Sequence, residues 1–97
     1  MPFGSPFPRT FSAGSILNLA PAVPGIYGLS NSQQWILIGR ASNIRDALLE
    51  HLSDATGIVN RLAATGFVFE ECDASLQAAR QDRLVLEYEP VGNRMLQ

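Results

Sequence analysis

Two short apolar runs with a polar stretch between them predict a β-hairpin over residues 25–40. GIYGL (25–29) and QWILIG (34–39) are rich in β-branched and aromatic residues, which are typical of strands, and Asn31-Ser32 supplies the turn. The second run is apolar at consecutive positions. Both of its faces are therefore expected to be covered, which predicts a central strand.

Helical spacing of apolar residues begins directly after the hairpin. Ser42 or Asn43 can cap a helix that runs to about Leu52, and Asp46 places a negative charge in its first turn. Residues 55–64 predict a shorter second helix, with Gly66 as its stop. The first helix is expected to turn one stripe toward the core: Ile44, Ala47, Leu48, His51 and Leu52.

The last third of the chain predicts a strand and a long helix. FVFEEC (67–72) has strand composition, and Asp73 can cap a helix over residues 74–89 that Pro90 ends. The sheet-facing stripe of this helix is predicted as Ala74, Ala78, Gln81, Val85 and Tyr88. A polar Gln81 on such a stripe is either hydrogen-bonded in the core or lines a site.

The order of these elements is strand, strand, helix, helix, strand, helix. It predicts a small α+β domain with a three-stranded, mainly antiparallel sheet and helices packed on it. Residues 24–97 form the predicted domain. Residues 1–23 are expected to be an extended or partly ordered arm, because three prolines fall in the first ten positions; residues 11–20 could add a helical turn or a strand.

Length and composition exclude several classes of protein. Ninety-seven residues allow one modest core. No apolar run approaches the roughly 20 residues of a spanning helix, and no basic segment precedes an apolar one, so we expect a cytoplasmic protein without membrane contact. Cys72 is the only cysteine and His51 the only histidine, which argues against a disulfide framework and a His/Cys zinc site.

Charge argues against strong binding to nucleic acid. Seven arginines face nine carboxylates, which gives a net charge of −2 and a pI near 5.2. Domains that bind DNA usually carry a basic excess, because their cations release counterions from phosphate. DNA is therefore expected to bind weakly, and a protein partner or self-association is favoured.

Three segments between Pro24 and Asn93 together resemble the GIY-YIG nuclease superfamily: PGIYGL, then WILIGRASNIRDALLEHL, then FVFEECDASLQAARQDRLVLEYEPVGN. The pattern is most like the N-terminal nuclease domain of the bacterial excision-repair endonuclease and small stand-alone proteins of the same type. The resemblance implies the same α+β fold and, for active members, hydrolysis of DNA phosphodiesters with a divalent cation.

Four positions to which the resemblance assigns a role are retained. It implies that Tyr27 is the first-strand tyrosine that helps deprotonate the attacking water. Arg40 stands where the repair enzymes have a lysine near the phosphate, and could anchor it. His51 matches a histidine often present in the family, and Asn93 ends its Pro-x-x-Asn motif.

Three positions are replaced by residues that lack the implied chemistry. Leu37 stands in place of the second tyrosine and has no hydroxyl. Ala47 replaces the arginine that stabilises the transition state, and Arg45, about 200° away around the helix, does not substitute for it. Gln81, twelve residues before Asn93, replaces the metal-binding glutamate with a neutral amide, a weak ligand for Mg²⁺.

Each retained residue also has an ordinary structural interpretation. Tyr27 could be a core aromatic, and His51 a packing residue with a hydrogen bond. Asn93 could satisfy backbone groups in the C-terminal turn, and Arg40 could lie on the surface.

The replaced residues weigh against catalysis, since metal and arginine supply most of the charge stabilisation in phosphodiester hydrolysis. The first hypothesis is a degenerate GIY-YIG-like binding or assembly module that needs no cofactor. An active divergent endonuclease using Mg²⁺ or Mn²⁺ stays open as an alternative, as does a DNA-binding protein that does not cleave.

Overall fold

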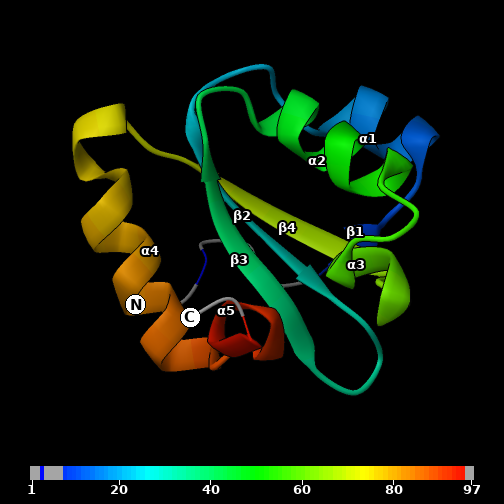
Figure 1. Cartoon of the computed structure of the whole chain (residues 1–97). Helices are drawn as coiled ribbons and strands as arrows, with labels where there is room; N and C mark the ends of the chain where they lie inside the picture. The colour runs from blue at the N-terminus through cyan, green and yellow to red at the C-terminus, as the bar shows by residue number, and fades with distance from the viewer. Residues whose placement is uncertain (1–2, 4–7, 96–97) are drawn as a thin grey trace.

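A computed structural model describes residue 3 and residues 8–95 of the chain (Figure 1). From β2 to α4 the elements follow the predicted order, which confirms the α+β class. The elements are β1 (Arg9–Thr10), α1 (Ala13–Leu19), β2 (Gly25–Ser30), β3 (Trp35–Ala41), α2 (Ile44–Ser53), α3 (Ile58–Arg61), β4 (Gly66–Glu71), α4 (Ala74–Tyr88) and α5 (Val91–Met95). In the part of the chain that the structure describes, no helix is long and apolar enough to span a membrane.

The sheet is antiparallel throughout, with the strand order β1-β4-β2-β3. It has four strands rather than three, because Arg9 and Thr10 pair with Phe67 and Gly66 at the edge of β4. Two residues are too few for an alternating pattern, so β1 leaves no signal in the sequence. The prediction that the WILIG run forms a central strand is wrong, since β3 is an edge strand and β2 is central.

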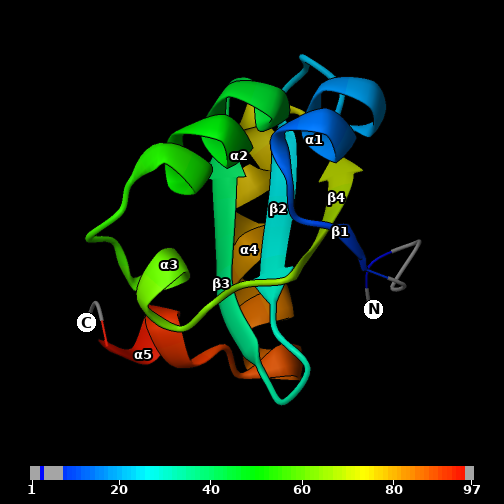
Figure 2. The same ribbon diagram turned by 90° about the vertical axis from the view of Figure 1, so that its right-hand side faces the viewer.

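Helices cover both faces of the sheet and also the edge of β3. Figures 1 and 2 show α4 on one face, α1, α2 and α3 on the other, and α5 beside β3. This cover explains why β3 is apolar at consecutive positions although it lies at an edge: Ile36, Leu37 and Ile38 are all buried. The core on the α4 face contains Phe3, Ile26, Ile38, Val68 and Leu84.

Two of the helix predictions need correction, and one is confirmed. The Asn43 side chain accepts a hydrogen bond from the Asp46 N–H (3.1 Å), so Asn43 caps α2 as expected. The helix predicted over residues 55–64 is the single turn α3. Ala63 has a φ of 54°, which ends the helical path, and Gly66 is the first residue of β4 rather than a helix stop.

The predicted sheet-facing stripe of α4 holds at Gln81, Val85 and Tyr88, which face the sheet, and is wrong in the first two turns of the helix. Gln77 and Leu84 are the buried residues of the helix, whereas Ala74 and Ala78 are exposed. Gln77 donates hydrogen bonds to the carbonyls of Ala41 (3.0 Å) and Cys72 (3.1 Å). The hydrophobic pattern did not predict that Gln77 is buried, because it counts only apolar residues. A glutamine can occupy a buried position when its amide is hydrogen-bonded to backbone carbonyls.

The segment before β2 contributes to the body of the fold. Helix α1 packs beside α2, and Phe11 and Ile16 lie in the core with Leu48. Within the predicted arm (1–23), residues 1–2 and 4–7 lie outside the described residues. The rest of the arm includes β1 and α1, which pack on the domain. The division into an arm (1–23) and a domain (24–97) stays a prediction.

Gly92 tests the cover on the β3 edge. A Cβ at this position would collide with the carbonyl oxygen of Ile36, because α5 approaches the strand backbone directly. We expect Gly92→Ala to lower the free energy of unfolding by about 1–3 kcal/mol. The matched control is Gly14→Ala in α1, where the added Cβ meets open space and should stabilise the helix by about 0.5–1 kcal/mol. Urea unfolding measures both; equal effects of the two substitutions contradict the close approach.

Candidate functional site

Tyr27 and His51 form the polar centre of the α2 face. Tyr27 lies on β2 opposite Gly39 of β3, and its ring passes over that glycine, where a Cβ would collide with the phenol. His51 comes from the last turn of α2. The Tyr27 hydroxyl and the His51 Nε2 are 2.8 Å apart and share a hydrogen bond. Gly39 therefore makes room for the ring that reaches the histidine.

Burial keeps both members of this pair neutral at neutral pH. It raises the pKa of Tyr27 to about 12, and the Glu50 carboxylate adds to the rise. Burial lowers the pKa of His51, an effect that Glu50 and then Asp54 oppose. A phenol with so high a pKa is a poor source of phenolate near pH 7, so the surroundings do not prepare Tyr27 to act as a base.

A cavity of about 340 Å³ opens beside Tyr27. The exposed Arg40 side chain contributes its one cationic group, while α2 contributes two carboxylates, Asp46 and Glu50. Ala47, where the resemblance implies an arginine, forms part of the wall. The lining residues are Tyr27, Arg40, Ala41, Ser42, Asn43, Asp46, Ala47 and Glu50. A neighbouring hollow of about 440 Å³ adds His51, Ser53 and Asp54.

Leu37 lies in the core and not in the cavity wall. It pairs with Leu29 across the hairpin, is 7% exposed and belongs to the same apolar cluster as Tyr27. A leucine at this position therefore contributes packing where the resemblance implies a second hydroxyl.

Gln81 and Asn93 meet at one residue of the edge strand, Ile38. Asn93 accepts a hydrogen bond from the Ile38 N–H (2.8 Å) and donates one to the Ile38 carbonyl (2.9 Å). Gln81 donates to the same carbonyl (2.9 Å). Gln81 thus faces the sheet and is hydrogen-bonded there, and neither amide is among the residues that line the Tyr27 cavity.

The seven positions singled out from the sequence therefore fall into three groups. Tyr27, Arg40 and Ala47 line the cavity and His51 lines the neighbouring hollow, whereas Leu37 lies in the core. Gln81 and Asn93 bind the strand edge instead.

Sequence reasoning missed Asp46 and Glu50 as cavity residues. Their spacing of four places both carboxylates on one side of α2, next to Ala47. That spacing could have predicted that they lie near the position of Ala47.

The residues present do not fit the single-glutamate metal site that the resemblance implies. Gln81 offers a neutral amide whose nitrogen points at the Ile38 carbonyl, and the cavity carboxylates come from another helix. Among residue 3 and residues 8–95, no three His, Cys, Asp or Glu side chains are placed to hold an ion together.

Comparison with solved structures gives one consistent result. The magnesium-bound GIY-YIG N-terminal endonuclease domain of UvrC from Thermotoga maritima matches with a TM-score of 0.67 and 28% identity, over 79% of this chain and 89% of that one. Two point mutants of the same domain, bound to its catalytic divalent cation, match with the same score and identity, over 88% of their chains. The chain resembles the GIY-YIG nuclease superfamily. No protein-family model and no curated protein matches.

This likeness confirms the GIY-YIG resemblance and the fold that it implied. The UvrC domain is described as bound to a catalytic divalent cation, which is a property of that domain. The family role of each site position in the present chain stays a prediction.

Gln81→Glu tests the amide at the strand edge. A carboxylate cannot donate to the Ile38 carbonyl and places negative charge beside it, so we expect a loss of about 1–3 kcal/mol in the free energy of unfolding at neutral pH. Gln81→Met removes the bond without adding charge and should cost less, because Asn93 still serves the same carbonyl. Urea unfolding of both variants measures the difference, and a Glu variant as stable as the wild type contradicts this role.

The lowered pKa of His51 makes stability depend on pH in a known direction. The unfolded histidine takes up its proton below about pH 6.5, while the folded one resists it. The stabilising contribution is therefore fully present above about pH 6.5 and is lost as pH falls through the lower folded pKa. His51→Gln should flatten the unfolding free energy between about pH 7.5 and 5.5, because the chain has no other histidine. An unchanged slope in the variant contradicts the prediction.

Proposed function

We propose that this chain is a GIY-YIG-like domain that has lost phosphodiester hydrolysis and serves as a binding or assembly module for a protein partner or a second copy. The charge around the Tyr27 cavity is the main support. The wall carries Ala47 where the resemblance implies an arginine, and the same helix adds Asp46 and Glu50.

Electrostatics at this cavity oppose a phosphate substrate. Phosphodiester hydrolysis adds negative charge in the transition state, and enzymes stabilise it with cations fixed in advance. Two carboxylates facing the cavity raise the energy of that charge. Arg40 is the one cation among the lining residues and is exposed to solvent, which weakens its field.

The strand edge gives a second, independent support. The Gln81 amide donates to the Ile38 carbonyl and has a role in the fold that needs no metal. Mg²⁺ is held in proteins by anionic oxygen, and a neutral amide does not replace a sole carboxylate ligand. Restoring the ligand would also mean breaking this hydrogen bond.

Surface features favour a protein partner over DNA. Arg45 does not add its charge to that of Arg40 at the cavity, because it is not among the lining residues and its Nε donates to the Ala20 carbonyl after α1 (2.9 Å). With the net charge of −2, no bulk attraction for phosphate is expected. Large apolar side chains are exposed on two helices instead: Leu17 and Leu19 on α1, and Leu76 and Leu86 on α4.

One observation favours an active divergent nuclease as the second candidate. Glu50 and Asp46 line the cavity beside Tyr27, so a carboxylate stands near the retained tyrosine although not at the family position. In that case Glu50 would have to provide the anionic oxygen for a divalent cation.

Cleavage assays separate the two candidates. Because the cavity lacks the implied cation and metal ligand, purified wild-type chain should not cut duplex, branched or single-stranded DNA in Mg²⁺ or Mn²⁺, even at stoichiometric amounts. Tyr27→Phe is the matched control for contaminating nuclease, and any background should be equal in both preparations.

Metal-dependent cutting by the wild type that Tyr27→Phe removes would contradict the proposal. If Glu50→Gln also removes it, while Glu71→Gln on β4 does not, the divergent nuclease is the correct function. Binding to DNA that weakens steeply with salt, without cutting, would instead support the non-cleaving DNA-binding alternative.

A further inference from the structure

We draw no further inference here: the strongest candidate, the row of carboxylates that Asp46, Glu50 and Asp54 form at a spacing of four beside the Tyr27 cavity and its neighbouring hollow, is an acidic cluster for which nothing else in residue 3 and residues 8–95 points to a ligand.

Discussion

The backbone of the edge strand β3 at Ile38 is the point on which the rest of the structure depends. An edge strand leaves N–H and C=O groups without a neighbouring strand, and these groups need partners once helices exclude water. Asn93 supplies a donor and an acceptor in one side chain, and Gln81 adds a second donor to the carbonyl. Through these bonds α4 and α5 are both fastened to the same residue. Asn93, which the resemblance assigns to the Pro-x-x-Asn motif, thus has a role in the fold that does not involve catalysis.

The same argument applies to the pair on the opposite face. Tyr27 passes over Gly39 and reaches His51, and this hydrogen bond joins β2 to α2 inside a largely apolar core. Three of the four retained positions therefore bond within the fold, and only Arg40 points to solvent. The replaced Ala47 is different, because it lies in the wall that a substrate would meet. Tyr27, His51 and Asn93 thus have roles in folding, whereas Ala47 lies at the cavity, and this contrast is consistent with the proposed loss of hydrolysis.

The elements from β2 to α4 could be predicted from the sequence because the residues that define them act locally. The polar turn at Asn31, the cap at Asn43 and the stop at Pro90 each act on neighbouring residues, and the elements from β2 to α4 follow from them. Features that depend on distant contacts were not predictable. The two-residue β1 exists only because β4 offers it an edge, and β3 could be apolar at an edge only because α5 covers it.

The site was predictable residue by residue but not as an arrangement. The order of motifs identified Tyr27, His51 and Gln81, yet nothing in it indicated that Gln81 would donate to a strand carbonyl while Tyr27 opened on a separate cavity. The negative charge beside Tyr27 was the feature that the sequence least revealed. Glu50 affects the pKa of Tyr27 only because α2 places its carboxylate at the same cavity.

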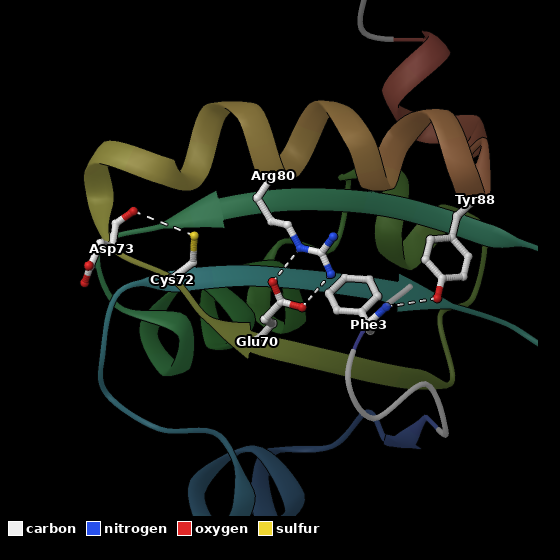
Figure 3. A network of polar contacts seen from close by, with 6 residues as sticks. All are labelled: Phe3, Glu70, Cys72, Asp73, Arg80 and Tyr88. Carbon is white, nitrogen blue, oxygen red and sulfur yellow. Dashed lines mark hydrogen bonds and ion pairs between the residues drawn. The ribbon is translucent and has the colours of Figure 1, made fainter. Parts of the chain in front are cut away.

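The α4 face, where the Phe3 N–H donates to the Tyr88 hydroxyl (Figure 3), and the Tyr27 cavity lie on opposite sides of one sheet. Assembly through the α4 face would therefore place no demand on the charge of the cavity. Under the proposed loss of hydrolysis, the residues around Tyr27 need only preserve packing and the bond to His51. Alanine at position 47 and the carboxylates beside it would then carry no penalty.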